Sequence, residues 1–358
     1  MMIFPFFIPH YGCQQRCVFC QQNRISGVAS ALTPAQVSQQ LAAILPPHGC
    51  GEVAFYGGSF TLLDDTLQRD YLACVEPFIR AGQVAGIRIS TRPDACDSEV
   101  AVRLKMAGVT TVELGCQSFS SEVLHLSQRG HGPRDAELSV TRLRNEGMRV
   151  GLQLMPGLPG GSFAEARYSL AQALSLRPDF LRIYPTVVLA GTALEHSWRQ
   201  GDFVPLTLDG AVELCAELLW HCRVAAMPVI RLGLQSSHEL DSGSAIIDGP
   251  YHPAFGQLVR SRLWRRALEA AATESINRQV QVAFADLSDA LGHRRANIDY
   301  LLHRFGSFDI VAQDGLTRET FVMDGRHCDV MSQARYLQPL STAAGSMDDG
   351  TPAFIGSL

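Results

Sequence analysis

The sequence predicts an α/β protein: a partial (β/α)6 TIM-like barrel followed by a small α+β C-terminal extension. Three observations support this fold class. Six short apolar runs recur through residue 184, helical segments separate them, and the pattern changes after Leu234. Continuous apolar runs are typical of parallel strands that are buried on both faces. We expect the barrel over residues 1–234, the extension over 235–336 and a flexible, low-complexity tail over 337–358.

The expected elements alternate as right-handed crossovers between parallel strands require. Strands are predicted over residues 3–8, 52–56, 86–90, 109–115, 148–154 and 180–184. Helices are predicted over residues 34–45, 63–80, 98–107, 133–146 and 163–176. The first helix opens with Thr33, Pro34 and Gln36, a capping-box pattern with proline at the first helical position. In the extension we expect helices at 253–272 and 295–305, and strands at 280–285, 308–312 and 320–323.

Composition narrows the class of protein. The 358 residues are 46% hydrophobic, which allows a large core, and the net charge of −5 argues against a globally basic nucleic-acid binder. Ten cysteines are too few for a disulfide scaffold in a chain of this length, so a reducing compartment is expected. The apolar start lacks the features of a signal peptide, and no apolar run is long enough to span a bilayer. We therefore expect a cytoplasmic protein with no membrane partner.

Three cysteines stand close together near the start of the chain: Cys13, Cys17 and Cys20, in the spacing C-x3-C-x2-C. Cysteine thiolates hold iron–sulfur clusters, and a [4Fe–4S] cluster has four irons. Three ligands with no local fourth leave one iron open to an exogenous ligand, which suits catalysis. Phe19 adds an apolar wall beside them. A zinc site and unligated core thiols are the alternatives, although zinc sites more often show two C-x2-C pairs.

The segments that follow the predicted strands carry the other candidate residues. The cysteines follow the first strand, Gly57 and Gly58 the second, Gln117 the fourth, and Gly157 and Gly160 the fifth. In barrels of this kind the active-site residues lie at the carboxyl ends of the strands. These segments are therefore expected to meet on one face.

Together these motifs resemble the radical S-adenosylmethionine (radical SAM) superfamily, and more narrowly the catalytic subunit of Elongator and its bacterial relatives. The resemblance rests on the cysteine triplet, the glycine pair, and residues 90–94, 113–118, 129–131, 155–160 and 182–186. It implies a [4Fe–4S] cluster on Cys13, Cys17 and Cys20, with S-adenosylmethionine (SAM) bound at the open iron. The implied reaction is reductive cleavage of SAM to methionine and a 5′-deoxyadenosyl radical, with no catalytic side chain assigned beyond the cluster ligands.

The resemblance also implies where SAM is held. Gly57 and Gly58 match a glycine pair whose backbone meets the SAM amino group, an approach that the missing Cβ permits. Arg129 has the spacing of an arginine that grips the SAM carboxylate in the related coproporphyrinogen oxidases. Gly157 and Gly160 look like loop glycines that let the backbone reach the cofactor.

The ribose and the adenine have expected contacts as well. Gln117 and Gln153 end the fourth and fifth strands, where they can bind the ribose hydroxyls. Ser90 stands where relatives often carry a ribose-binding glutamate, and its shorter hydroxyl would need a water bridge or another partner. Three further side chains are expected to frame the adenine: Phe19, Met155 and Tyr184.

The function expected from the resemblance is radical SAM chemistry on tRNA, with electrons from a donor such as flavodoxin or ferredoxin. After Leu234 we recognise no glycine-rich acetyl-CoA loop, and too few residues remain for both the extension and an acetyltransferase domain. Acetyl transfer is therefore not expected. The alternatives are oxygen-independent porphyrinogen oxidation and a non-catalytic cluster or haem carrier, although a carrier needs no ribose or carboxylate contacts.

Two further features lie outside the motifs. Four arginines surround Trp264 in the expected helix of the extension, and they indicate either a phosphate-binding patch or a solvated helix face: Arg260, Arg262, Arg265 and Arg266. The scattered cysteines are expected to pack in the core, with Cys215 and Cys222 on one face of a helix.

Overall fold

A computed structural model describes residues 2–8, 13, 17–21 and 30–340. Residues 341–358, most of the expected tail, lie outside this range. The barrel strands are β1 (Ile3–Phe7), β2 (Glu52–Tyr56), β3 (Gly86–Thr91), β4 (Val109–Gln117), β5 (Arg149–Leu154), β6 (Phe180–Ile183) and β8 (Val229–Leu232). All six predicted strands are present, and their bounds differ from the prediction by no more than a few residues.

These strands form one parallel sheet in the order β1-β2-β3-β4-β5-β6-β8, seven strands within the described residues. The predicted partial α/β barrel is therefore confirmed, with one strand more than the six predicted. The additional strand, β8, is four residues long, half exposed and interrupted by Arg231, so it has no continuous apolar run that would reveal it.

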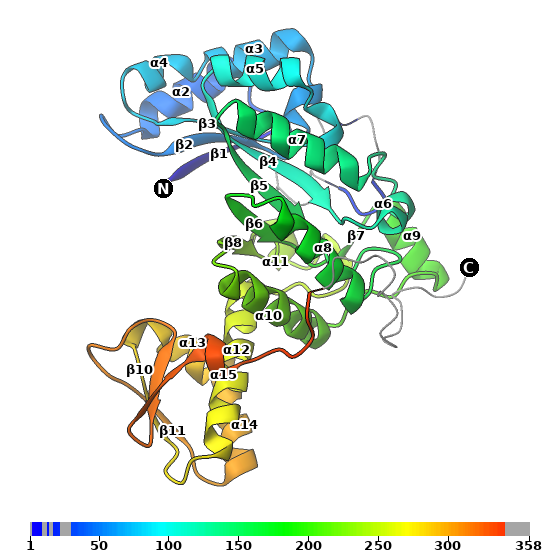
Figure 1. Cartoon of the computed structure of the whole chain (residues 1–358). Coiled ribbons are helices and arrows are strands. Elements are labelled where there is room, and N and C mark those ends of the chain that lie inside the picture. Colours follow the sequence, from blue (N-terminus) through cyan, green and yellow to red (C-terminus); the bar gives the residue numbers. More distant parts are fainter. Residues whose placement is uncertain (1, 9–12, 14–16, 22–29, 341–358) are drawn as a thin grey trace.

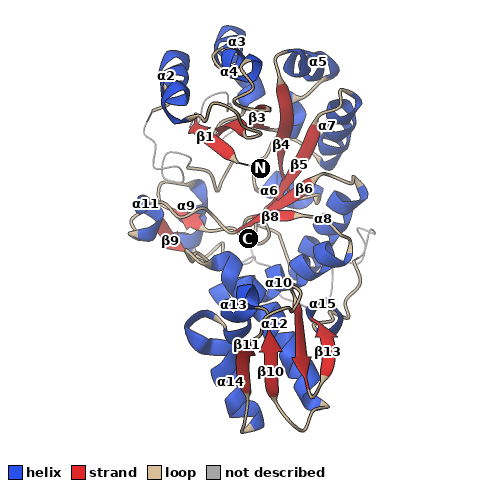
Figure 2. Ribbon diagram, turned by 90° about the vertical axis from the view of Figure 1, so that its left-hand side faces the viewer, coloured by secondary structure: helices blue, strands red, loops and turns tan. Residues whose placement is uncertain are grey.

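The helices between the strands lie on the outside of the curved sheet (Figures 1 and 2). They are α2 (Pro34–Ile44), α3 (Asp65–Ala73), α4 (Glu76–Arg80), α5 (Ser98–Met106), α7 (Pro133–Asn145), α8 (Phe163–Ser175) and α10 (Leu208–Val224). The capping box is confirmed, because the backbone N–H of Gln36 donates to Thr33 Oγ1 over 3.3 Å and that of Thr33 donates to Gln36 Oε1 over 2.9 Å. The single helix predicted over 63–80 is wrong. It is divided into α3 and α4, and Pro77 stands in the first turn of α4, where a missing N–H is tolerated.

Short elements that the sequence did not reveal lie near the carboxyl ends of the strands. They are α6 (Ser121–Leu126), β7 (Val188–Leu189), α9 (Ala193–Gln200), α11 (His238–Asp241), β9 (Ile246–Asp248) and the 3-10 turns η1 (Phe60–Leu62) and η2 (Pro93–Ala95). β7 and β9 form an antiparallel pair, so two segments on either side of residue 234 lie side by side. Two or three residues are too short a run for a periodic pattern.

The extension is built on α12 (Phe255–Thr273), which packs against α10. Its other elements are β10 (Gln279–Val282), η3 (Phe284–Asp286), α13 (Leu287–Leu291), η4 (His293–Arg295), α14 (Ala296–Phe305), β11 (Asp309–Ala312), β12 (Thr320–Met323), β13 (Arg326–Asp329) and α15 (Val330–Gln333). The strands form a sheet in the order β11-β10-β12-β13 (Figure 2). The ring centroids of Trp264 and of Phe321 on β12 lie 6.0 Å apart. The predicted α+β character is observed.

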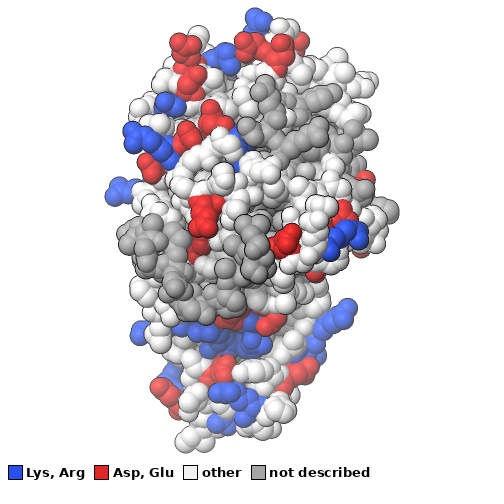
Figure 3. All heavy atoms as spheres, turned by 90° about the vertical axis from the view of Figure 1, so that its right-hand side faces the viewer, with Lys and Arg blue, Asp and Glu red and all other residues white. Residues whose placement is uncertain are grey.

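Two of the four arginines of α12 pair with acidic residues of α10. Arg262 forms ion pairs with Asp209 and Glu213 of α10, and Arg266 lies 3.3 Å from the same Glu213. The other two are engaged inside the extension, Arg260 with Asp289 and Arg265 over the ring of Tyr300. Figure 3 shows acidic and basic side chains interspersed over the lower part of the molecule, where the extension lies. The side chains of Arg260 and Arg266 are about 40% exposed although paired, whereas that of Arg262 is largely buried, so the solvated helix face is present only in part and the phosphate-binding patch stays a prediction.

Four of the other cysteines lie in the core as expected, whereas Cys50 is exposed and Cys74 and Cys328 are only partly buried. Cys96, Cys116, Cys215 and Cys222 are buried, and the last two lie on α10. Burial raises the pKa of Cys116 to about 12, so this thiol is inert although it neighbours Gln117. In the part of the chain that the structure describes, we find no helix with the length and apolar character of a membrane span.

Candidate functional site

A cavity of about 1100 Å³ lies at the carboxyl ends of the barrel strands. Twelve of the predicted site residues line it: Cys13, Cys17, Phe19, Cys20, Gly57, Gly58, Ser90, Gln117, Arg129, Gln153, Met155 and Tyr184. Pockets for one small molecule commonly measure about 300–1,000 Å³. The cavity is therefore large enough to hold a cofactor.

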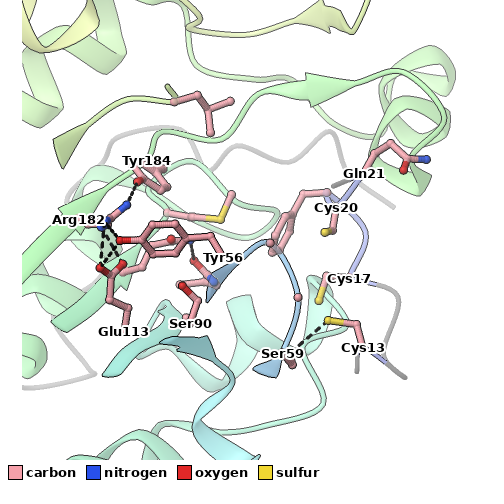
Figure 4. A pocket seen from close by; sticks show the side chains of 18 of the residues that line it. Cys13, Cys17, Cys20, Gln21, Tyr56, Ser59, Ser90, Glu113, Arg182 and Tyr184 are labelled. Carbon is pink, nitrogen blue, oxygen red and sulfur yellow. Dashed lines mark hydrogen bonds and ion pairs between the residues drawn. The ribbon is translucent and has the colours of Figure 1, made fainter. Parts of the chain in front are cut away.

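The three cysteines occupy one end of the cavity, which we call the cysteine end (Figure 4). Cys13 Sγ lies 3.1 Å from Ser59 Oγ, and Arg129 Nη1 donates to Cys17 Sγ over 3.1 Å. Within the described residues, no three His, Cys, Asp or Glu side chains are arranged so that they could hold a metal ion. The sulfurs share a wall of the cavity without forming a closed site.

Arg129 is fixed on three sides. Besides Cys17, its guanidinium donates to the Gly115 carbonyl over 2.6 Å and to His131 Nε2 over 3.2 Å. Burial and the Arg129 charge lower the pKa of His131 to about 4, so the imidazole is neutral at pH 7 and can accept this bond. Arg92 donates to the Arg129 carbonyl, which brings a second guanidinium to this end.

The donor chemistry at the cysteine end, three thiols in one cavity wall, is the kind that holds an iron–sulfur cluster. Three thiols face the same cavity, and the side chains of Arg92 and Arg129 lie beside them. Burial is the largest influence on the pKa of Arg92 and lowers it. Asp94, and to a smaller extent the thiols of Cys17 and Cys13, more than offset this effect, so the pKa lies above its usual value. Because a cluster is bound by anionic thiolates, two neighbouring cations offset part of its charge.

Two turns at this edge of the sheet have unusual backbone geometry. Gly57 has a φ of +98°, which favours glycine, and Gln117 has a φ of +69°, which is uncommon for any other residue. Gln153 Nε2 donates to Gln117 Oε1 over 3.0 Å, and the Gln117 carbonyl accepts from the N–H of Met155 over 2.7 Å. The two glutamines predicted to bind ribose are therefore joined to each other across β4 and β5. A strained backbone of this kind is typical of functional sites.

Gly157 and Gly160 have a different role from the predicted one. Neither is among the residues that line the cavity. Both have positive φ, and a Cβ would lie 2.9 Å from Leu206 at the first position and 2.6 Å from Leu126 at the second. They serve the turn and its packing rather than the approach of the backbone to a cofactor.

The opposite end of the cavity holds charged residues that the sequence analysis did not assign; we call it the strand end. Glu113 Oε1 lies 2.7 Å from Arg88 Nη1 and accepts from the Tyr56 hydroxyl over 3.1 Å, while its Oε2 lies 2.8 Å from Arg182 Nε. Arg88 Nη2 also pairs with Glu52 over 2.6 Å. Figure 4 shows Tyr56, Glu113 and Arg182 pointing toward one another, away from the cysteines.

The strand end neutralises its own charge. Burial raises the pKa of Glu52, but hydrogen bonds from Thr111 and Thr110, together with Arg88, bring it below the usual value. Burial and the Glu113 charge raise the pKa of Tyr56, so its hydroxyl stays protonated and can donate. Two carboxylates and two guanidinium groups therefore balance one another in the interior of the barrel.

Alternation of inward-facing side chains with a period of two residues along each strand could have predicted the residues at the strand end. Glu113, Gly115 and Gln117 alternate along β4, and all three line the cavity, as do Arg182 and Tyr184. Ser90 on β3 pairs in register with Glu113 on β4. A carboxylate thus stands beside Ser90, but its oxygens are taken by Arg88, Arg182 and Tyr56, so it does not replace the glutamate expected at position 90.

Comparison with known families agrees with this geometry. The family model described as the Radical SAM superfamily matches residues 7–171, and the one described as the Radical SAM C-terminal domain matches residues 178–265. The chain belongs to the radical SAM superfamily. It is therefore an enzyme of the radical SAM class, and the second match continues beyond residue 234 into α12.

The curated relatives include proteins named tRNA uridine(34) acetyltransferase and others named Elongator complex protein 3. The tRNA uridine(34) acetyltransferase of Methanocaldococcus infernus is 36% identical over 129 residues, which are 35% of this chain and 24% of that protein. The protein of the same name from Dehalococcoides mccartyi is 28% identical over 251 residues, 58% of this chain and 53% of that protein. The matched regions thus span between about a quarter and about half of these relatives.

A solved structure agrees in fold. The archaeal Methanocaldococcus infernus Elp3 with an N-terminal deletion superposes with a TM-score of 0.57 at 23% identity, covering 72% of this chain and 61% of that one. At this identity the likeness establishes the partial barrel and not the reaction.

Proposed function

We propose that this radical SAM enzyme holds a [4Fe–4S] cluster on Cys13, Cys17 and Cys20, cleaves SAM reductively, and acts on a tRNA. The observation that carries the proposal is the cavity, which is lined by the three cysteines and by nine of the residues expected to contact SAM. When bound, such a cluster supplies the electron that splits SAM into methionine and a 5′-deoxyadenosyl radical, which abstracts a hydrogen atom from the substrate.

The chain's own residues would bind and orient SAM. The backbone at Gly57 and Gly58 would meet the amino group, since the positive φ of Gly57 turns the chain at this point. The Arg129 guanidinium has five N–H donors and uses three of them on His131, Cys17 and Gly115, so two remain for the SAM carboxylate. Gln117 and Gln153, already fixed to each other, would meet the ribose.

The remaining SAM contacts are proposed because the residues line the cavity. Ser90 lines the cavity and would reach the ribose through a water molecule. The apolar side chains proposed around the adenine lie on the same cavity: Phe19, Met155 and Tyr184. Tyr184 also accepts from Arg182 Nη1 over 2.9 Å, so one side chain would join the SAM contacts to the strand end.

The tRNA substrate rests on the names of the relatives. Both relatives described above are named for uridine 34 of tRNA, and the matched region lies in the part of this chain that forms the cavity. Reduction of the cluster would need a one-electron donor such as flavodoxin or ferredoxin. The expected cytoplasmic location remains a prediction.

Anaerobic reconstitution tests the proposal directly. The protein is loaded with iron and sulfide and incubated with SAM and a chemical reductant, and 5′-deoxyadenosine is quantified with and without bulk tRNA. We expect 5′-deoxyadenosine to form only when iron, sulfide, SAM and the reductant are all present. Adding tRNA should increase its rate about tenfold or more, because bound substrate positions the reacting atoms. Ribonuclease-digested tRNA is the control.

Two outcomes would contradict different parts. A full complement of iron with no 5′-deoxyadenosine would refute SAM cleavage. Formation of 5′-deoxyadenosine at the same rate with intact tRNA, digested tRNA and no RNA would refute the tRNA substrate and leave the radical chemistry in place.

A further inference from the structure

Two side chains outside the cysteine motif lie against its sulfur atoms. Ser59 Oγ is 3.1 Å from Cys13 Sγ, and Arg129 Nη1 is 3.1 Å from Cys17 Sγ. We propose that Ser59 and Arg129 donate hydrogen bonds to the thiolates of two cluster ligands and thereby raise the reduction potential of the cluster. This inference rests on the cluster of the proposed function. Ser59 has no role in the sequence-based assignment, and the role given there to Arg129 concerns SAM.

The position of Ser59 favours this role over a structural one. Ser59 precedes the 3-10 turn η1 at the N-cap position, where a serine side chain typically accepts from a backbone N–H. Its hydroxyl makes no such bond here. Instead it is directed at Cys13, and the residue is only 3% exposed. Because a thiolate has no proton to give, the hydroxyl must be the donor when Cys13 binds iron.

Arg129 reaches Cys17 from a separate element. The residue follows α6, and its guanidinium is oriented by the Gly115 carbonyl and by His131. These two contacts leave Nη1 directed at the sulfur, so the guanidinium does not need to be ordered by the cluster. Arginine remains protonated in proteins, and a charged donor to an anionic acceptor makes a strong hydrogen bond.

The effect on the cluster follows from electrostatics. A reduced cluster carries one more negative charge than an oxidised one, and part of this charge lies on the sulfurs. Hydrogen bonds to the sulfurs stabilise the more negative state more strongly, and they are among the factors that set cluster potentials. Removing either donor should therefore make the cluster harder to reduce. Ser59 and Arg129 act on the iron through the cysteines, so both are positioning residues.

Matched serine variants provide the test. Ser59→Ala removes the hydroxyl, Ser59→Thr keeps it, and Ser162→Ala removes a different serine hydroxyl, one that accepts from the Glu165 N–H over 3.0 Å to cap α8 outside the cavity. Iron is measured first in the reconstituted full-length proteins. The midpoint potential is then titrated without SAM by electron paramagnetic resonance.

We expect Ser59→Ala to keep its iron and to shift the potential to a more negative value, and Ser59→Thr and Ser162→Ala to match the wild type. Arg129→Gln removes a charged donor and should shift the potential further than Ser59→Ala. An unchanged potential in Ser59→Ala, an equal shift in Ser59→Thr, or loss of iron from Ser59→Ala with normal iron in Ser162→Ala would overturn the role of Ser59. A smaller shift in Arg129→Gln would overturn the role of Arg129.

The iron measurement separates this inference from the proposed function. A wild-type protein that binds no cluster refutes the proposed function and the inference together. A wild-type protein with a full cluster whose potential does not depend on Ser59 refutes the inference alone.

Discussion

The two ends of the cavity are built on different principles. At the strand end, Arg88, Glu113 and Arg182 stand on three neighbouring or nearby strands and satisfy one another, with Glu52 completing the balance of charge. At the cysteine end, the sulfurs are carried on the segment after β1, and Arg129 approaches them from the segment after α6. One end is complete without a ligand, and the other presents donors toward groups that become anionic when they bind iron.

The difference shows which part of the site folding alone can form. Parallel strands fix side chains in register, so ionised groups buried among them must be paired before any ligand arrives. Segments after strands are under less constraint, and their charges can be balanced by a bound group instead. We therefore expect substitutions at the strand end to lower the free energy of unfolding, and substitutions at the cysteine end to weaken ligand binding.

The largest expected effect is at the cysteine end. Replacing Cys13, Cys17 and Cys20 together by alanine should reduce bound iron from about four atoms per chain to nearly none, because the thiolates are the proposed anchors of the cluster. Iron and sulfide are assayed after anaerobic reconstitution. Cys50→Ala, at an exposed cysteine, is the control and should keep its iron. A triple variant that retains a full cluster would remove the basis for distinguishing the two ends.

At the strand end, Glu113→Gln should destabilise the fold by about 3–5 kcal/mol. It removes a carboxylate from between two buried guanidinium groups, and breaking a buried pair leaves an uncompensated charge. Urea unfolding of the iron-free protein measures this. Glu76→Gln breaks a pair whose side chains are more than half exposed and should cost less than about 1 kcal/mol. If Glu113→Gln is as stable as the wild type, the strand end does not depend on its internal pairing.

The sequence predicted the fold and the cysteine end better than the strand end. The strands are continuous apolar runs in which packing determines the residue type, so β2 was predicted with the bounds that the structure shows. The cysteine end is marked by short motifs of cysteine and glycine, because ligands demand particular residue types at fixed spacings.

The strand end carries no such motif. Arg88 and Glu113 are single charged residues within apolar strands, and their partners come from strands far apart in the chain. Only register brings them together, and a bulge shifts the register between β4 and β5 just before Gln117. The role of the α12 arginines was missed for the same reason, since Asp209 and Glu213 lie on α10. Pairing over long sequence separations is not visible in composition or periodicity.

A pH effect of intermediate size should come from His131, which supports Arg129. Its pKa of about 4 in the folded protein lies below the ordinary 6.5, so folding favours the neutral ring. This contribution to stability is complete above about pH 6.5, and it is lost as the pH falls toward 4. It amounts to at most about 3 kcal/mol. His131→Gln keeps an acceptor without titrating, so urea unfolding of this variant should depend less on pH in that window. The same pH dependence in both proteins would contradict the assignment.

The smallest effect expected is on SAM affinity at the cysteine end. Gly58→Val places a branched side chain on the cavity wall where the SAM amino group is proposed to approach, and should weaken SAM binding about tenfold or more, which corresponds to about 1.4 kcal/mol. Iron content should stay near normal, because Gly58 is not a ligand. Gly132→Val is the matched control, since a Cβ at Gly132 meets no atom within 4 Å and its φ of −112° suits a branched residue. Isothermal titration of the reconstituted proteins measures the affinities. Equal loss of iron and SAM in Gly58→Val would identify Gly58 as a folding residue, and the cysteine end would then resemble the strand end in forming before its ligand.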